Sequence, residues 1–155
     1  MKKNAIIDDS GMYRYMLMRQ WGKGNRFINF ILLNPSTADH EKDDPTVKAC
    51  IAIAQNNGFD GVYITNLFAF RATQPKDLKQ ATDPIGPENE TYLLKYNQLS
   101  EKTIVAWGNH GSFFGGAKRV LDLFSKKTLY CLVKNKSGTP KHLLYVKRDT
   151  FPVVF

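Results

Sequence analysis

Short apolar runs that end in polar segments recur along this chain. The clearest four cover residues 27–33, 62–65, 103–106 and 128–133. An apolar run of this length between turn-forming residues is typical of a strand that is buried on both faces of a parallel sheet. Helical patterns separate the runs, and this alternation predicts an α/β fold with right-handed crossovers between parallel strands.

Helix signals lie in the connections between these runs. Asp44 suits a helix cap, Pro45 suits the first helical position, and Gly58 follows where the helix should end. Further helices are expected at residues 87–102 and 116–125. The buried face of the first helix is expected at Val47, Cys50, Ile51 and Ala54.

The first 25 residues predict a β-hairpin, because residues 5–8 and 12–21 flank the turn formers Asp9-Ser10-Gly11. Residues 26–155 are expected to form the parallel-sheet core. We therefore predict a single α/β domain over residues 1–155, built as a three-layer sandwich. Its central four-stranded parallel sheet carries helices on both faces, and the N-terminal hairpin is added to it.

Composition sets the class of protein. With 155 residues and 43% hydrophobic side chains, the chain is long and apolar enough to form a globular core. No apolar run is long enough to cross a bilayer, and no signal core precedes Asp8, so we expect a cytoplasmic protein. Cys50 and Cys131 are expected to be core residues in a reducing compartment. The three histidines are scattered, so we expect no metal site.

The charge is unevenly distributed. The net charge is +8, and residues 101–155 hold ten Lys or Arg against three Asp or Glu. The first hundred residues hold twelve basic and eleven acidic side chains. This asymmetry indicates one face that can bind a polyanion such as nucleic acid. The alternative is a solvated basic surface that keeps the protein soluble.

Polar segments at the ends of four strands predict a binding crevice. In open α/β sheets, ligands bind just beyond the carboxyl ends of the parallel strands. The first segment, Asn34-Pro35-Ser36-Thr37, offers an uncharged amide that can hold a water, although Asn34 can also simply form an Asx-turn. Asp39 or Asp43 in the following acidic cluster is a candidate general base if it points into the crevice, whereas helix capping and a solvated acidic turn are the plainer interpretation.

The second segment follows the strand at residues 62–65. Asn66 can read the donor–acceptor edge of a pyrimidine, or can satisfy neighbouring backbone groups. Phe68 and Phe70 are candidate stacking faces, although core packing explains them equally well. Arg71 is a candidate phosphate contact or an ion-pair partner.

The third segment, Trp107-Gly108-Asn109-His110, combines a glycine with polar groups, which allows a ligand to approach the backbone closely. His110 is a candidate acid or hydrogen-bond donor, and the alternative is an ordinary loop histidine. Trp107 is interpreted mainly as a core residue that can also border the crevice, and Asn109 as a substrate-binding residue.

The last segment is the most basic. Lysines here can grip phosphates, and Leu143 or Leu144 can wedge into a base stack, whereas a cationic surface loop with a buried leucine is the alternative. The candidate nucleic-acid-binding residues of this segment are Lys136, Thr139, Lys141, Leu143, Lys147 and Arg148.

In order and type, these segments resemble the motifs of the uracil-DNA glycosylase superfamily. Leu33-Asn34-Pro35-Ser36 resembles its water-positioning motif, in the variant that has Asn in place of Asp. Ile64-Thr65-Asn66-Leu67 is similar to the motif whose Asn reads the pyrimidine, and Val105-Ala106-Trp107-Gly108-Asn109 to its apolar strand ending in Trp-Gly. The segment 139–144 resembles the last motif, where either Thr139 or His142 takes the place of the family's His; we prefer His142 because threonine stabilises a leaving anion poorly.

The chain as a whole is similar to the DUF1643 family of uncharacterised bacterial and phage proteins. The matching stretches are Leu33-Asn34-Pro35-Ser36-Thr37-Ala38-Asp39, Asp43-Asp44-Pro45-Thr46, Asn66-Leu67-Phe68-Ala69, Arg71-Ala72-Thr73 and Ala106-Trp107-Gly108. This resemblance is more specific than the glycosylase one, but it implies no reaction.

The glycosylase resemblance implies a fold of that superfamily and a base-excision enzyme that needs no metal or organic cofactor. The target nucleotide leaves the DNA stack, Asn66 holds the pyrimidine, Asn34 positions water, and His142 or His110 stabilises the departing base. Two other interpretations stay open. One is a nucleic-acid-binding module without catalysis, and the other is an enzyme that acts on free nucleosides or nucleotides.

Overall fold

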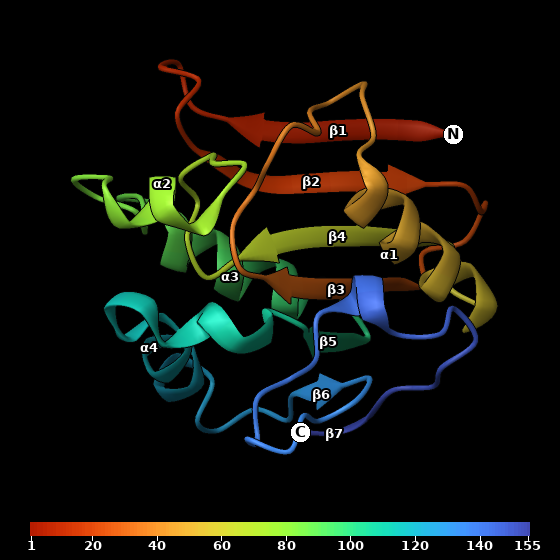
Figure 1. Cartoon of the computed structure of the whole chain (residues 1–155). Coiled ribbons are helices and arrows are strands. Elements are labelled where there is room, and N and C mark those ends of the chain that lie inside the picture. The colour runs from red at the N-terminus through yellow and green to blue at the C-terminus, as the bar shows by residue number, and fades with distance from the viewer.

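Seven strands form one mixed sheet in the order β1-β2-β4-β3-β5-β6-β7, as Figure 1 shows. The computed structural model describes all residues from 1 to 155. The strands are β1 (Lys2–Ile7), β2 (Arg14–Gln20), β3 (Phe27–Leu32), β4 (Gly61–Asn66), β5 (Lys102–Val105), β6 (Tyr130–Cys131) and β7 (Val153–Val154).

The predicted α/β class is confirmed, and the sheet is wider than the expected four strands. β3 pairs in parallel with β4 and β5, and β5 pairs in parallel with β6. The expected hairpin of β1 and β2 joins this sheet, because β2 pairs antiparallel with β4. At the other edge β7 pairs antiparallel with β6, a strand that the sequence pattern did not indicate.

The central strand β3 is apolar at every position except Asn29, and its surroundings explain this pattern. All six of its residues are buried, and successive side chains enter different cores. Ile28, Phe30 and Leu32 pack with the first helix, whereas Ile31 packs with the helices on the opposite face. Both faces of this strand are therefore covered, as the pattern predicts for a parallel sheet with helical crossovers.

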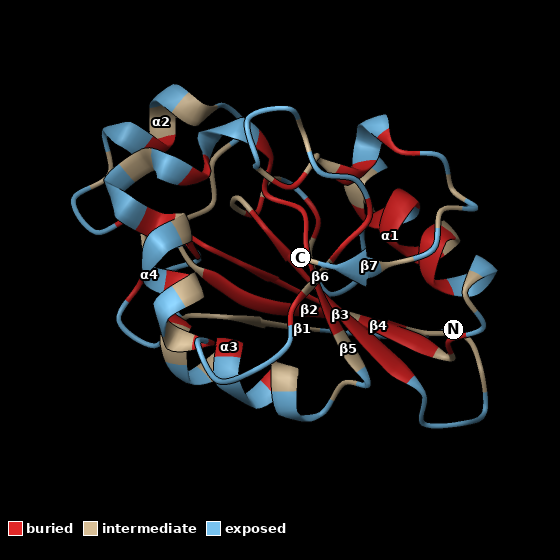
Figure 2. Cartoon of the chain, turned by 90° about the horizontal axis from the view of Figure 1, so that it is seen from below, coloured by how far each residue is buried: buried red, intermediate tan, exposed pale blue.

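Helices lie on both faces of the sheet (Figure 2). One face carries α1 (Pro45–Asn56) and the short 3-10 helix η2 (Leu143–Tyr145), and the other carries α3 (Asn89–Gln98) and α4 (Gly116–Leu123). The 3-10 helix η1 (Gly108–Gly115) precedes α4, and α2 (Pro75–Lys79) is a single short turn. No helix combines the length and the apolar character that a membrane span requires.

The start of α1 follows the sequence signal closely. Asp44 is the cap residue, and its Oδ1 accepts a hydrogen bond from the backbone N–H of Val47 at 2.9 Å. Pro45 is the first helical residue, and Gly58 adopts a left-handed φ of 79° just after the helix. The four positions expected on its inner face are all buried.

Three of the differences from the predicted boundaries have a clear physical reason. The helix expected at residues 87–102 ends at Gln98, because Lys102 already belongs to β5 and Glu101 N–H bonds to the Phe27 carbonyl of β3. The strand expected at 128–133 shrinks to two residues, since the chain then folds back and Lys141 N–H bonds to the Val133 carbonyl. The loop expected at 71–87 contains α2, which Pro75 starts.

The two cysteines are buried and unbridged, as the sequence predicted. Burial raises the pKa of the Cys50 thiol well above its ordinary value, because the interior disfavours the thiolate. Cys50 therefore behaves as a small core side chain of α1.

Candidate functional site

A cavity of about 610 Å³ opens at the carboxyl ends of the parallel strands. Leu32 of β3 and Ile64 of β4 form part of its floor, and Trp107 and Gly108 approach it from the end of β5. β3 lies between β4 and β5 in the sheet, so the cavity occupies the point where the strand order reverses. Its volume is in the range of small-molecule sites.

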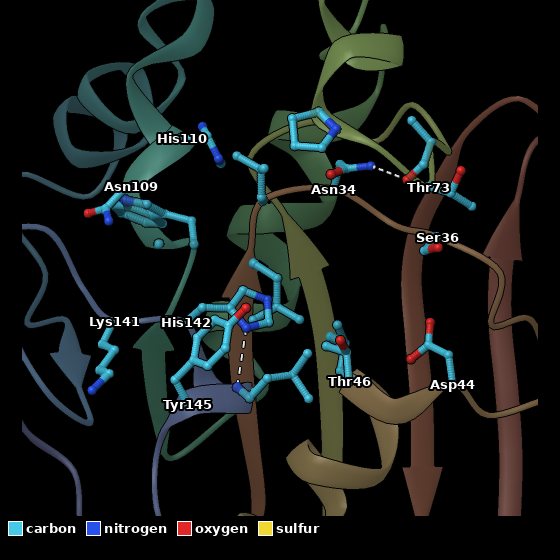
Figure 3. A pocket seen from close by; sticks show the side chains of 18 of the residues that line it. Asn34, Ser36, Asp44, Thr46, Thr73, Asn109, His110, Lys141, His142 and Tyr145 are labelled. Atoms are coloured by element: carbon cyan, nitrogen blue, oxygen red, sulfur yellow. Dashed lines mark hydrogen bonds between the residues drawn. The ribbon is translucent and has the colours of Figure 1, made fainter.

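Three of the four predicted loops contribute to this cavity. The predicted site residues that line it are Asn34, Ser36, Trp107, Asn109, His110, Lys141 and His142. Figure 3 shows the labelled side chains of these loops around the same hollow, with η2 and the start of α1 on one side. The loops are far apart in the sequence and meet here because parallel strands deliver them to one edge of the sheet.

Asn34 has a fixed amide orientation. Its Nδ2 donates to the carbonyl of Ala72 at 2.8 Å and to that of Pro35 at 3.0 Å. Both amide hydrogens are therefore used on backbone carbonyls, while Oδ1 accepts no hydrogen bond from the protein. Asn34 thus brings a free acceptor, and no proton donor, to the cavity wall.

His142 has a fixed tautomer. Its Nδ1 accepts a hydrogen bond from the backbone N–H of Leu144 at 3.2 Å, so the proton of the neutral ring lies on Nε2 (Figure 3). Burial lowers the pKa of His142 below its ordinary value of 6.5, which favours the neutral ring at pH 7. His142 is therefore a neutral donor.

His110 and Trp107 form another part of the wall. His110 is exposed on η1, and its ring lies 5.0 Å from the ring of Phe113 between centroids. Lys79 of α2 sits over the same Phe113 ring at 4.2 Å, which ties α2 to η1. Trp107 is only 3% exposed and serves both as a core residue and as a wall of the cavity.

The structure adds residues that the sequence reasoning missed. Arg14 of β2 lines the cavity although only 3% of it is exposed, and Asp44 and Thr46 border it from the start of α1. The signal for Arg14 was present in the sequence, because an arginine inside the half-buried strand pattern of residues 12–19 must either pair or face a site. The remaining polar lining residues not predicted are Thr73, Asn135 and Tyr145.

Asn66 does not line the cavity, which corrects its expected position. It ends β4 on the same face as Val62 and Ile64, since side chains two residues apart share a face. It is 1% exposed, and neither amide atom of its side chain has a hydrogen-bond partner. Its amide is therefore buried and is not displayed in the cavity.

Three apolar candidates do not line the cavity. Phe68 is fully buried among α3 and α4 residues, with Gly116 packed closely on its ring, so no face is free for stacking. Leu143 is fully buried in the other core, against α1, because η2 turns it inward. Leu144, the next residue, is exposed and lines the cavity instead. Phe70 lies outside the cavity and packs edge-on against Tyr13.

Asp39 lies outside the cavity and supports a turn. Its Oδ1 accepts hydrogen bonds from the backbone N–H groups of Lys42 and Glu41, which lower the pKa of the carboxyl group. A carboxylate stabilised in this way is a weak base. Asp43 is likewise occupied, because Arg19 donates to it at 2.8 Å. Nowhere in the chain do three His, Cys, Asp or Glu side chains gather as a metal site would require.

The basic candidates differ in their positions relative to the cavity. Arg148 is structural, since its Nη1 donates to the carbonyls of Leu143 and Val146 and so holds η2. Arg71 lies in a shallow neighbouring pocket that shares Ser36 with the main cavity. Lys136 and Lys147 are exposed and lie outside the cavity, whereas Lys141 lines it.

Thr139 is engaged within the protein. Its hydroxyl donates to Asn109 Oδ1 at 2.7 Å and accepts a hydrogen bond from Asn135 Nδ2 at 3.0 Å. These bonds tie the last loop to the start of η1. Thr139 therefore fixes the shape of the rim that Asn109 and Asn135 form, and it does not itself line the cavity.

Comparison with known proteins identifies one relationship. The model of the family described as "Protein of unknown function (DUF1643)" matches residues 14–144, which include every strand of the sheet except the two edge strands β1 and β7. No curated protein and no solved structure matches the chain.

Proposed function

We propose that this chain, which belongs to the DUF1643 family, removes a modified, damaged or mismatched pyrimidine from DNA by hydrolysing its N-glycosidic bond. One observation carries the proposal: a free amide acceptor on Asn34 and a neutral imidazole donor on His142 line the same cavity. These are the two functions that hydrolysis of such a bond needs from a protein, namely a held water and a stabilised leaving group.

In the proposed reaction, the bond between C1′ and the base nitrogen breaks, and its electron pair leaves with the base. Positive charge grows on the sugar, as in other glycosyl cleavages. His142 Nε2–H donates to the base as negative charge develops there. A water held by Asn34 Oδ1 adds to C1′ and releases its proton to solvent, so the products are the free base and an abasic sugar.

The rim of the cavity supports a nucleic-acid substrate. Leu144 and Tyr145 follow His142 directly, are exposed, and line the opening together with Lys141. Exposed aromatic and cationic side chains at one opening suit the stacked bases and phosphates of a nucleic acid. The excess of basic over acidic residues in the last third of the chain also suits a polyanionic partner.

The same proposal assigns the fold to the uracil-DNA glycosylase type, with the parallel strands β4-β3-β5-β6 as the middle of three layers. The order of the motif-bearing loops around the cavity supports this assignment. The buried position of Asn66 departs from it, so the proposal does not assign pyrimidine reading to that residue.

The test is an excision assay. Single-stranded and duplex oligonucleotides that carry uracil, 5-hydroxymethyluracil or a mismatched thymine are incubated with the protein and then treated with alkali, which cleaves abasic sites. We expect strand scission with at least one substrate, and a loss of about 100-fold or more in Asn34→Ala and His142→Ala. His40→Ala is the matched control, because His40 is exposed and lies outside the cavity.

The outcomes separate the three interpretations. Scission that both site variants lose supports the proposal. Salt-sensitive DNA binding without scission overturns it in favour of a binding module. Base release from free nucleosides or nucleotides, with no affinity for DNA, overturns it in favour of an enzyme of nucleotide metabolism.

A further inference from the structure

We propose that Arg14 binds an anionic oxygen group of the substrate, a phosphate or a carboxylate, in the cavity. This inference deepens the proposed function, and it rests on that function only for the identity of the rest of the substrate. It is carried by a buried guanidinium group that lines the cavity, has no ion-pair partner and makes a single hydrogen bond to the protein.

The hydrogen bonds of Arg14 are incomplete. Nη1 donates to the carbonyl of Ala38 at 3.0 Å, Nε is buried without a partner, and Nη2 makes no hydrogen bond to the protein. No carboxylate lies within ion-pair distance of the group. Burial lowers the pKa of Arg14 to about 10, so the group still carries its charge at neutral pH.

Arg19 provides an internal comparison on the same strand. It is also completely buried, yet its Nε pairs with Asp43 at 2.8 Å, and its Nη atoms donate to three backbone carbonyls. Arg19 thus makes four hydrogen bonds within the protein, including one to a carboxylate, whereas Arg14 makes one. A buried charge without a partner is costly, so an arginine that is kept in this state indicates a ligand that completes it.

The surroundings of Arg14 favour an anion. The charged side chains that act on it include the carboxylate of Asp44 and two further cations, Arg71 and Arg19. Thr46 lines the cavity from the first turn of α1, where the helix dipole is positive. The Asp44 carboxylate, whose Oδ1 caps α1, opposes an anion, whereas Arg71 and Arg19 favour one.

Two substrate parts can supply this group. One is a phosphate of a nucleotide that enters the cavity whole, and the other is an acidic substituent on a pyrimidine base. Both present two or more oxygens to the planar fork of a guanidinium group, which is the geometry that arginine recognises best. The chemistry that Arg14 recognises is therefore the same, and the experiment separates the sources.

The experiment measures thermal stability and binding, and it does not require turnover. Inorganic phosphate, 2′-deoxyuridine 5′-monophosphate and 5-carboxyuracil are added separately, with 2′-deoxyuridine and uracil as uncharged controls. We expect at least one anionic probe to raise the Tm of the wild-type protein while its uncharged control does not. In Arg14→Met this rise is lost, and calorimetric titration gives binding that is about 10-fold to 100-fold weaker.

The Tm values of the variants without ligand show whether the loss of binding comes from the loss of Arg14 itself or from a destabilised fold. Arg14→Met removes a buried charge that has no ion-pair partner, so its Tm should be unchanged or higher. Arg19→Met should have a lower Tm, because it breaks the ion pair with Asp43. A Tm of ligand-free Arg14→Met that falls as far as that of Arg19→Met identifies Arg14 as a structural residue and overturns the inference.

The probes identify the source. A response to phosphate and the nucleotide assigns the group to a phosphate, and a response to 5-carboxyuracil alone assigns it to the base. If no anionic probe raises the Tm, or if the rise persists in Arg14→Met, the inference is wrong. Each of these results is independent of whether the excision assay succeeds.

Discussion

The backbone N–H of Leu144 donates to Nδ1 of His142 at 3.2 Å, and this single bond defines the protonation of the ring. Because Nδ1 is the acceptor, the neutral imidazole carries its proton on Nε2. The bond also begins η2, since His142 is the cap residue of that turn. The chemistry of the cavity wall and the local backbone are therefore linked through one side chain.

This link predicts a pH dependence of stability. Burial lowers the pKa of His142 in the folded protein, so the unfolded chain binds this proton at higher pH than the folded one. The contribution of the neutral ring is complete above about pH 6.5 and is lost as the pH falls through the lowered pKa of the folded state. Protonation of Nδ1 also breaks the bond to Leu144.

The measurement is the Tm of the wild-type protein and of His142→Gln between pH 5 and pH 7.5. The wild-type Tm should fall more steeply towards acid than that of the variant, because only the wild-type protein has this group. Parallel curves would show that the surroundings of the ring do not lower the pKa of His142. The other titrating groups are common to both proteins and cancel in the comparison.

The buried pair of Arg19 and Asp43 should be a major contributor to stability. The Arg19 side chain is fully buried, and Asp43 is 20% exposed, so removal of the guanidinium leaves a poorly solvated carboxylate. We expect Arg19→Met to lower the free energy of unfolding in urea by about 3 kcal/mol. The double variant with Asp43→Asn should lose less than the sum of the two single changes, because they remove the same interaction. Additive losses would contradict this account.

Gly111 controls the position of Trp107. A Cβ at Gly111 would overlap the indole ring of Trp107, which is 3% exposed and lines the cavity. Gly111→Ala should therefore destabilise the protein by about 1–3 kcal/mol and shift its tryptophan fluorescence. Ser112→Ala is the control, since Ser112 is the exposed neighbour on η1. Equal stability of the two variants would mean that the ring has room to move.

The sequence was sufficient for those parts of the fold that depend on local chemistry. The cap at Asp44, the proline after it and the glycine at 58 all act within one turn of helix, so α1 could be predicted. The width of the sheet could not be predicted, because β7 is two residues long and exists only through its pairing with β6. A strand that depends on a distant partner leaves no periodic signal of its own.

In the candidate site, the positions of the loops could be predicted from the sequence, whereas the directions of individual side chains could not. Parallel strands bring their carboxyl ends together, so the meeting of Asn34 with His142 followed from strand order. The direction of individual side chains did not follow. Phe68 and Leu143 turn into opposite cores, and Asn66 is buried outside the cavity lining, because each direction depends on packing across the sheet. The strand pattern marks Arg14 as an arginine that needs a partner or a site, but which of the two it has depends on the tertiary packing of β2.

Tyr145 offers a test of the cavity rim that does not disturb the core. Its side chain is 75% exposed, and it lines the opening beside His142, with ring centroids 6.1 Å apart. If the rim holds a nucleic-acid base by stacking, Tyr145→Ala should weaken binding of a single-stranded oligonucleotide by about 5-fold to 100-fold, whereas Tyr145→Phe should retain it. Fluorescence anisotropy at fixed salt measures this loss, and urea unfolding should show almost no change in stability.

Phe151→Ala is the matched control, because Phe151 is an aromatic of similar exposure, 71%, that lies outside the cavity. Equal weakening in both variants would point to general surface hydrophobicity and not to a stacking site, since the two aromatic groups differ chiefly in their distance from the opening.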